Sequence, residues 1–447
     1  MLDYNLLDDS QLDLIDRIYG HDATLVYATM GSGKTVCYLT AASELLSEDI
    51  INRVLIVAPL RPCNEVWAEE HKKWAHLQHL DVAVATGSAD KRLAAINSGA
   101  QIVVINIENL VWFLDTFKKN LGFDALCIDE LSKFSNNSNK GVKKLRTKTK
   151  LFKHHVGLTG TPVHESFLSL FSQCLVLDGG DRLGRNFDTF KRLYFYATDY
   201  NEHNWELLPS ADTRLLGQLK DLIYSMPDYT HTLPKLTEHL HDFELSDESS
   251  EAFKHFAKHS VIEIGGVEIV AENAAVLSGK LEQFNSGFLY VEGDALQISD
   301  TFERFEAFKK LVSLLCSKNC LIFYTFEEEK QQIIDALVGD YSLISEKGVV
   351  DNWNAGKIKN LVLHPKSAGH GLNLAGGGHT IILYSPIWSN DMYKQLVGRL
   401  WRRGQKKAVD VHILRECLNG LDDMKLQRVT DKSEHDAQLK SWLASLA

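Results

Sequence analysis

The residues ATMGSGKT, at positions 28–35, have the types and spacing of a phosphate-binding loop. Its glycines allow backbone N–H groups to turn inward around phosphate oxygens. Lys34 is spaced to reach the β- and γ-phosphates of a nucleotide, and Thr35 offers a hydroxyl to Mg²⁺. We therefore expect an ATP site whose loop consists of Met30, Gly31, Ser32, Gly33, Lys34 and Thr35.

A pair of carboxylates follows about a hundred residues later, in LCIDEL at 126–131. Asp129 ends an apolar run that is typical of a strand, and an Asp in this position can hold Mg²⁺ through water. The adjacent Glu130 can orient and deprotonate a water molecule that attacks the γ-phosphate. In combination with the loop, the pair predicts ATP hydrolysis with Thr35 and Asp129 at the metal.

A basic stretch near the carboxyl end, QLVGRLWRRGQKK, begins at residue 395. Phosphoryl transfer spreads negative charge over the γ-phosphoryl oxygens, and an inserted arginine stabilises that charge. Arg399 and Arg402 are three residues apart on a predicted helix, so we expect them to project from one face as a catalytic pair. We interpret Arg403, Lys406 and Lys407 as solvated surface cations.

Short apolar runs alternate with longer amphipathic stretches, which is typical of an α/β fold with parallel sheets. Nearly continuous apolar runs predict strands that are covered on both faces. The first half predicts strands at 24–29, 54–60, 102–107, 126–131 and 156–161, and the second half at 320–325, 361–365, 381–385 and 409–414. Helices are expected between them, at 36–47, 62–75, 109–119 and 301–315.

This pattern predicts three segments. Residues 1–165 form a nucleotide-binding unit, and residues 301–447 form a second α/β unit that carries the arginines. Between them, 166–300 is expected to be a mostly helical and more polar insertion. It contains SMPDYTHTLPKL at 225–236, whose two prolines are typical of a crossover between units.

The composition is that of a globular protein, with 45% apolar residues, 24% charged residues and a formal net charge of −11. An acidic balance argues against a protein that coats nucleic acid over its whole surface, but it permits a local basic track. The seven cysteines lack paired metal-binding spacing, and the amino terminus lacks the pattern of a signal peptide. Since no apolar run approaches the roughly eighteen residues of a membrane span, we expect a soluble cytoplasmic protein with no membrane partner.

One basic track, KGVKKLRTKTKLFKHH at 140–155, carries seven Lys or Arg and no acid. A solvated surface loop is one interpretation of this track. Its position directly after the strand that ends at Asp129 makes contact with a nucleic-acid backbone an equal alternative.

The order of these motifs resembles that of superfamily-two helicase-type motors, and more narrowly that of Swi/Snf-like DNA translocases. Gln11 stands where the family has an adenine-reading glutamine. The segment VLIVAPLRPCNEVWAEEHKKW (54–74) is similar to the first nucleic-acid motif, IDELSKF (128–134) to the DExx box, and GLTGTPV (157–163) to the coupling motif. The box reads DELS where remodellers usually have DEAH, which leaves its Asp and Glu in place.

The second half continues this order. NCLIFYTF at 319–326 resembles the motif that opens the second lobe of the family. SAGHGLNLAGGGHTIILYSPIWS at 367–389 is similar to its Gly-Leu-Asn-Leu segment, with the strand and Trp that follow. QLVGRLWRRGQ matches the final motif and is the most specific of the set, with Gln395, Arg399, Arg402 and Gln405 in register.

This resemblance implies two RecA-like lobes with ATP bound between them, in a compact monomer of the bacteriophage or bacterial type. The first lobe would supply Lys34, Thr35, Asp129 and Glu130, and the second Arg399, Arg402 and, near the γ-phosphate, Gln395. The family grips double-stranded DNA by its phosphates, which gives sequence-independent binding. The motifs and the basic track predict nucleic-acid contacts from Arg61, Lys133, Lys140, Lys143, Lys144, Arg146, Ser367, Gly369 and Trp388.

Three functions remain open at this point. The first is an ATP-dependent translocase on double-stranded DNA. The second is a strand-separating helicase on branched DNA or RNA, for which VIEIGGVEIV at 261–270 is the expected separating hairpin. The third is a non-motor regulator that uses ATP binding as a switch to engage a protein partner, which suits the acidic surface.

Overall fold

The computed structural model describes residues 1–160, 167–202, 204–298, 302–367 and 372–431. The chain divides into two compact units. Unit 1 contains Met1–His231, and unit 2 begins at Thr232. The segment 166–300, expected as one mostly helical insertion, is therefore shared between the two units, and it contains short strands as well as helices.

Unit 1 is built on a seven-stranded sheet in the order β3-β4-β2-β5-β6-β1-β9, in which every pairing is parallel. The five strands predicted in the first half are confirmed as β1, β2, β4, β5 and β6. The strands are β1 (Ala23–Tyr27), β2 (Val54–Ala58), β3 (Val82–Ala85), β4 (Ile102–Asn106), β5 (Ala125–Asp129), β6 (His154–Thr159) and β9 (Ile223–Ser225).

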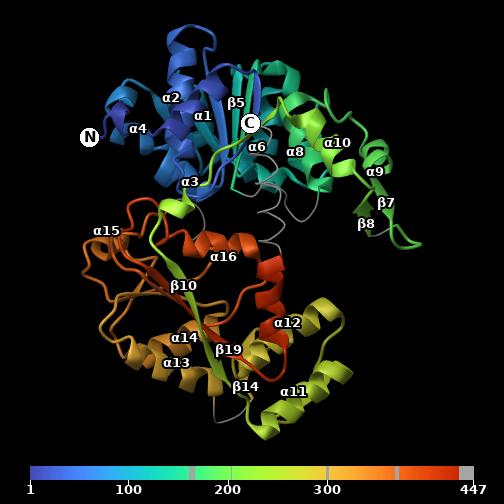
Figure 1. Ribbon diagram of the computed structural model, residues 1–447, viewed down its shortest axis with the longest axis vertical. Helices are drawn as coiled ribbons and strands as arrows, with labels where there is room; N and C mark the ends of the chain where they lie inside the picture. The colour runs from blue at the N-terminus through green and yellow to red at the C-terminus, as the bar shows by residue number, and fades with distance from the viewer. Residues whose placement is uncertain (161–166, 203, 299–301, 368–371, 432–447) are drawn as a thin grey trace. The chain divides into compact units, whose positions relative to one another are not determined.

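Both faces of this sheet are covered, which explains the continuous apolar runs of its strands. Along β2, Leu55 and Val57 face one apolar cluster, whereas Val54 and Ile56 face the other. Figure 1 shows the blue helices α1 and α2 and the green helices α8 and α10 around the sheet. The helices of unit 1 are α1 (Asp9–Tyr19), α2 (Lys34–Ser47), α3 (Leu60–Pro62), a π-helix (Cys63–Trp67), α4 (Glu70–Lys73), α5 (Ala89–Ile96), α6 (Leu110–Phe117), α7 (Lys140–Leu145), α8 (Leu168–Asp178), α9 (Phe187–Tyr194) and α10 (Ala211–Leu219), and a small hairpin pairs β7 (Phe195–Ala197) with β8 (Trp205–Leu207).

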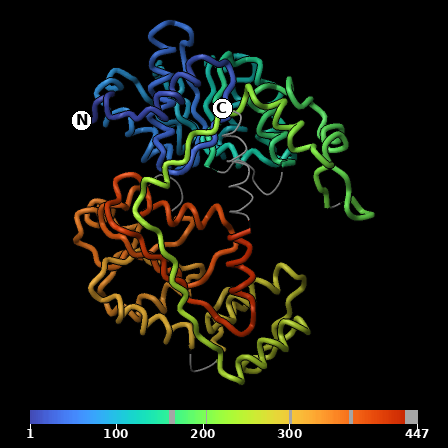
Figure 2. Tube along the Cα trace, viewed as in Figure 1, coloured from blue at the N-terminus to red at the C-terminus, as the bar shows by residue number. Residues whose placement is uncertain are grey.

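Unit 2 is built on a six-stranded sheet in the order β10-β19-β18-β15-β17-β16, again with every pairing parallel. The four strands predicted in the second half are confirmed. Figure 2 shows the light-green β10 running beside the red β19, although the two are far apart in sequence. The strands are β10 (Leu236–Phe243), β15 (Cys320–Phe323), β16 (Ser342–Leu343), β17 (Asn360–Leu363), β18 (Thr380–Leu383) and β19 (Val409–Glu416).

Two antiparallel hairpins accompany this sheet. The hairpin predicted at 261–270 is confirmed, and Gly265 and Gly266 make its turn with φ values of +59° and +79°. The hairpins are β11 (Val261–Ile264) with β12 (Val267–Val270) and β13 (Phe288–Val291) with β14 (Asp294–Gln297). The helices of unit 2 are α11 (Asp247–His259), α12 (Ala274–Asn285), α13 (Glu303–Leu314), α14 (Glu327–Leu337), α15 (Val349–Asn354) and α16 (Asn390–Val397).

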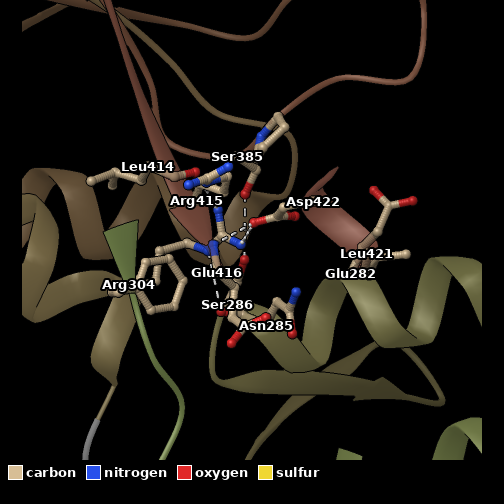
Figure 3. Close-up of polar contacts among 12 residues, drawn as sticks. Glu282, Asn285, Ser286, Arg304, Ser385, Leu414, Arg415, Glu416, Leu421 and Asp422 are labelled. Carbon is tan, nitrogen blue, oxygen red and sulfur yellow. Dashed lines mark hydrogen bonds and ion pairs between the residues drawn. The ribbon is translucent and has the colours of Figure 1, made fainter. Parts of the chain in front are cut away.

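A buried ion pair holds part of unit 2 together. Arg304 of α13 and Asp422 are each 1% exposed at the side chain and lie 2.8 Å apart. The same guanidinium donates to the carbonyl oxygens of Asn285 and Tyr384, at 3.1 and 2.8 Å. Figure 3 shows this arginine surrounded by acceptors from several segments.

The predicted fold class is confirmed: both units are parallel α/β sheets flanked by helices, which is the architecture of RecA-like lobes. Among the helices that the structure describes, none is long and apolar enough to cross a membrane.

Candidate active site

The phosphate-binding loop connects β1 to α2 at the carboxyl edge of the unit 1 sheet. Gly31 and Gly33 have φ values of +81° and +90°, a left-handed conformation that favours glycine. Gly33 caps the fourteen-residue helix α2, so the free N–H groups of its first turn face the loop. The Nζ atom of Lys34 donates to the carbonyl oxygen of Ala28 at 2.7 Å, so the loop curls around its own cation.

Gln11 supports this loop from α1. Its Nε2 donates to the carbonyl oxygen of Ser32 at 3.0 Å, and its Oε1 accepts from the backbone N–H of Asp8 at 3.0 Å. The side chain is 5% exposed, and a Cβ atom at Gly33 would lie 2.2 Å from its Nε2. In this structure Gln11 therefore bonds to the loop through its Nε2 and to the amino-terminal cap of α1 through its Oε1, while its expected contact with adenine stays a prediction.

The Asp–Glu pair lies where β5 ends. Oδ2 of Asp129 accepts a 2.9 Å hydrogen bond from the indole of Trp67, which is fully buried on the π-helix. Oδ1 accepts from the backbone N–H of Glu130 at 3.1 Å. Glu130 itself has φ +57°, a conformation that costs energy for a residue with a side chain and is common at functional sites.

The sheet brings the loop and the pair to one edge. The strand β6 lies between β1 and β5, with Thr159 opposite Tyr27 and Leu158 opposite Asp129. Neighbouring strands are spaced by about 4.8 Å, so Asp129 lies roughly 10 Å across the edge from the strand that leads into the loop. A Cβ atom at Gly160 would contact Met30 at 3.6 Å, which places the end of β6 against the loop.

The segment after β9 also contacts the loop, which sequence reasoning missed. The backbone N–H of Met226 donates to Tyr27 at 2.8 Å, and the hydroxyl of Tyr229 donates to the carbonyl oxygen of Met30. The hydroxyl of Thr29 lies 3.4 Å from Oδ1 of Asp228. The first residues of the predicted crossover at 225–236 thus contact the phosphate-binding loop within unit 1. No local residue pattern predicts this contact.

Burial keeps the nearby thiols protonated. It raises the pKa of Cys63 to about 12, and the negative charges of Asp129 and Glu108 act in the same direction. The pKa of Cys127, on β5, is also raised well above its ordinary value by burial and then by Asp129. The chemically active anions at this edge are therefore carboxylates, and the oxygen donors of Thr35 and Asp129 suit Mg²⁺.

The paired arginines of unit 2 follow α16 and do not lie on it. The predicted helix ends at Val397 with Gly398 as its cap, so the expected shared helical face is wrong. Arg399 and Arg402 nevertheless point the same way, because each donates through Nη1 to the carbonyl oxygen of Leu372 at 3.2 Å. Arg399 is 1% exposed, whereas Arg402 is only partly buried.

The two glutamines of the same motif differ in their surroundings. Gln395 lies on α16 and is partly exposed. Gln405 links the turn after α16 to the segment 375–378, because its Nε2 donates to the carbonyl oxygens of Ala375 and Gly378 at 3.2 and 3.1 Å. Its Oε1 accepts from two backbone N–H groups at 3.0 Å, those of Lys406 and Lys407. The conspicuous Gly-Gln of the motif therefore has a structural role in shaping this turn.

The basic track forms α7 and the turns that follow it. Val142 and Leu145 are buried, so the helix packs on unit 1 by its apolar side. Lys144 is paired with Asp115. The exposed cations of the track are Lys140, Lys143, Arg146, Lys150 and Lys153, and Lys133 before it is exposed as well.

The other predicted nucleic-acid residues are dispersed. Arg61 is bonded to Glu65 at 2.9 Å, and Ser367 is exposed. The indole of Trp388 donates to Glu282, and the ammonium of Lys425 lies 5.6 Å from its ring. Gly369 and residues 161–163 of the coupling motif lie outside the described residues.

The fold and this site define the class of the protein, an ATPase of the helicase type. Residues 19–286 match the SNF2-related domain family, and residues 297–404 match the helicase conserved C-terminal domain. Since the first match extends over more than half of the chain, the chain belongs to the SNF2-related family, whose members are nucleic-acid-stimulated ATPases.

Several proteins are similar to this chain. Protein p41 of Acyrthosiphon pisum secondary endosymbiont phage 1 is 28% identical over 94% of both chains. The Bacillus subtilis protein YwqA, named an ATP-dependent helicase/translocase, is 22% identical over 73% of this chain and 37% of its own length. Human RAD54B, named a DNA repair and recombination protein, is 23% identical over 92% of this chain and 51% of its own. The chain thus spans about a third to a half of these last two relatives.

Among solved structures, the SWI2/SNF2 ATPase core of Sulfolobus solfataricus in complex with double-stranded DNA is 20% identical. The alignment covers 99% of this chain and 95% of that one, with a TM-score of 0.46.

Proposed function

We propose that the protein is an ATP-dependent translocase that moves along double-stranded DNA as a monomer. The observation that carries the proposal is the placement of the phosphate-binding loop and the pair Asp129–Glu130 at one edge of a parallel sheet, in a chain of the SNF2-related family. The relatives named as helicase/translocase and as recombination protein support the same activity.

In this proposal Lys34 leaves the carbonyl oxygen of Ala28 and binds the β- and γ-phosphates of ATP. Thr35 and Asp129 would hold Mg²⁺, which would supply positive charge to the phosphates. Glu130 takes the proton of the attacking water. Arg399 and Arg402 stabilise the charge that develops on the transferred phosphoryl group, which is worth about 10³–10⁵ in rate where an arginine finger has been measured.

The proposed DNA-binding surface is the exposed face of α7 with its neighbour Lys133. Lys140, Lys143 and Arg146 present their charge to solvent while the apolar side of the helix is buried. Cations that neutralise phosphates release counterions, so binding at this surface would weaken steeply with salt. Because the chain has a net charge of −11, most of its surface would repel DNA, so binding would depend on a local basic track of this kind.

The test is the ATPase rate of the full chain without nucleic acid and then with duplex DNA, single-stranded DNA and RNA. The proposal expects the largest stimulation by duplex DNA, together with displacement of a third strand from a DNA triplex. The double variant Lys140→Gln/Lys143→Gln should lose stimulation yet keep the basal rate. Lys258→Gln/Lys347→Gln, two exposed lysines of unit 2, serves as the matched control.

Other results would select the remaining candidates. Stimulation by single strands or RNA with release of a paired strand would favour a helicase that uses the hairpin β11–β12. If the chain binds ATP but no nucleic acid raises its ATPase rate, both the translocase and the helicase would be overturned. That result would favour an ATP-switched regulator of a protein partner.

A further inference from the structure

The edge strand β10 and its neighbour β19 carry a group of titratable side chains that the ATP site does not use. In the parallel register of these strands, His239 lies opposite His412 and Thr237 lies opposite Asp410. Because side chains alternate between the two faces of a sheet, His239, His241, Asp410 and His412 all lie on one face.

The same face continues into the apolar core of unit 2. Two residues beyond the histidines, Phe243 and Leu414 are buried with residues of α13 in one cluster. Figure 1 shows β10 and β19 side by side in this unit. Polar groups at the rim of an apolar core cost free energy unless they are hydrogen-bonded or bind an ion.

The donor atoms of this group lie close together. Nε2 of His239 lies 3.0 Å from Oδ1 of Asp410, and Nε2 of His241 lies 2.9 Å from Nδ1 of His412. The rings of His239 and His412 stack with their centroids 4.8 Å apart. One ligand atom each from His239, Asp410 and His412 lie within 4.8 Å of one another.

His412 provides a second and independent observation. The residue is 7% exposed, and its Nε2 has no hydrogen-bond partner among the described residues. Such buried, unsatisfied polar atoms are rare in folded proteins and call for a ligand or a water.

We propose that His239, Asp410 and His412 bind one divalent transition-metal ion of the Zn²⁺ type. A set of two imidazoles and one carboxylate favours Zn²⁺ over Mg²⁺ and Ca²⁺, which prefer oxygen alone. His241 holds Nδ1 of His412 and so leaves its Nε2 for the metal, as outer partners of metal-binding histidines do. A water molecule completes the tetrahedron.

The geometry requires only side-chain rotation. Bonds of about 2.0–2.1 Å in a tetrahedral zinc site put the ligand atoms about 3.3 Å apart. The contact of 3.0 Å between His239 and Asp410 is already close to this spacing. Their side chains are 41% and 24% exposed, which leaves room for the rings and the carboxylate to turn toward His412.

One cation competes with the metal. Nζ of Lys318, which follows α13, lies 3.1 Å from Oδ2 of Asp410. Loss of the Lys318 charge should therefore strengthen metal binding at the carboxylate.

The consequence would be a cross-link between β10 and β19. The strand β10 opens unit 2 and lies at the edge of its sheet, where only one neighbour holds it. An ion bound by both strands would stabilise this edge without any part in ATP hydrolysis. The inference therefore stands apart from the proposed function.

The experiment titrates Zn²⁺ into the full chain after treatment with a chelator, without nucleotide and with excess Mg²⁺ to fill oxygen-only sites. A chromophoric chelator reports competition, and thermal unfolding reports stabilisation. We expect binding of one ion per chain and a higher unfolding midpoint. His239→Gln and Asp410→Asn should each weaken binding about tenfold or more, and Lys318→Met should strengthen it.

A matched control addresses the other histidine pair. His255 and His259 lie one turn apart on α11, with ring centroids 4.5 Å apart, and both are exposed. The variant His255→Gln/His259→Gln should keep the tight site. Circular dichroism checks that each variant is folded. A folded His239→Gln chain that binds Zn²⁺ as tightly as the parent would overturn the proposal. Absence of one-to-one binding, or its loss in the control alone, would do the same.

Discussion

The indole of Trp67 donates a 2.9 Å hydrogen bond to Oδ2 of Asp129, so a fully buried side chain orients the carboxylate at the end of β5. The other oxygen accepts from the backbone N–H of Glu130. One hydrogen bond to each oxygen therefore fixes the orientation of the Asp129 carboxylate. In our proposal this is a group that would hold Mg²⁺.

Trp67→Phe should therefore reduce catalysis more than nucleotide affinity. Phenylalanine keeps the aromatic packing against Tyr38 but removes the donor. We expect the ATPase rate to fall about tenfold, as it does when outer partners of metal-binding groups are lost, and the Mg²⁺ concentration for half-maximal rate to rise. Trp74→Phe is the control, because its indole donates to Glu70 away from the site. Equal losses in the two variants would contradict a positioning role.

Glu130→Gln should bind ATP and fail to hydrolyse it. The amide keeps the size of the side chain but cannot accept a proton, so turnover should fall by about 10²–10⁴, the usual contribution of a general base. Nucleotide affinity, measured with a fluorescent ATP analogue, should stay within about twofold because uniform binding does not depend on the base. Glu108→Gln, whose carboxylate accepts from Asn106, is the control. Normal turnover of Glu130→Gln would refute its assignment as the base.

Arg402→Ala should lower the rate far more than ATP affinity, since a transition-state charge is lost and ground-state binding is kept. Its partly exposed position makes the variant foldable. Arg399→Ala should lower both the rate and the stability of the fold, because that residue is 1% exposed. Single-turnover hydrolysis and thermal unfolding separate the two effects. Lys406→Ala, at an exposed cation of the same motif, is the control and should change neither the hydrolysis rate nor the unfolding midpoint. If Arg402→Ala lowered ATP affinity as much as it lowered the rate, Arg402 would be a binding residue instead.

The strands that position the site could be predicted from the sequence because both faces of each sheet are covered. The run 102–105 is apolar at every position, so it predicts a buried strand. The strand β10 was not predicted because it is an edge strand of mostly polar residues, LTEHLHDF, and the prolines before it indicated only a crossover. Edge strands lose the signal that makes central strands conspicuous.

The candidate site was predictable in its residue types but not in its supports. The phosphate-binding loop has a local pattern, whereas the indole of Trp67 reaches Asp129 across 62 residues and belongs to no short motif. The helix expected around Arg399 stops at Gly398, since a glycine cap interrupts a pattern that otherwise continues. Long-range contacts and helix ends depend on tertiary packing, which local patterns do not encode.

Arg304→Met should destabilise unit 2 strongly. The substitution leaves the carboxylate of Asp422 buried without its partner, which typically costs about 3–5 kcal/mol, and it frees the carbonyl oxygens drawn in Figure 3. The double variant Arg304→Met/Asp422→Leu should recover part of this loss because no charge stays buried. Lys359→Met, which removes an exposed ion pair with Asp340, should change the free energy of unfolding little. Denaturant unfolding measures all three, and equal effects of Arg304→Met and Lys359→Met would contradict the argument.

The central strand β6 should lose stability in mild acid. Burial lowers the pKa of both His154 and His155, whose Nε2 atoms bond to the carbonyl oxygens of Ile18 and Thr149 at 2.8 and 2.9 Å. A histidine with a depressed folded-state pKa binds its proton more readily when the chain is unfolded. Its stabilising contribution is therefore complete above the unfolded pKa of about 6.5 and is lost as the pH falls from there toward the folded pKa.

His155→Gln should flatten this pH dependence. Glutamine keeps an amide donor for Thr149 but does not titrate, so the variant should lose less stability than the parent between about pH 6.5 and 5. Each titrating group contributes at most about 1.4 kcal/mol per pH unit. Hydrogen exchange of the β6 amides as a function of pH measures the effect locally. His255→Gln, at an exposed position on α11, should leave the β6 profile unchanged, and an unchanged acid slope in His155→Gln would show that this histidine does not control it.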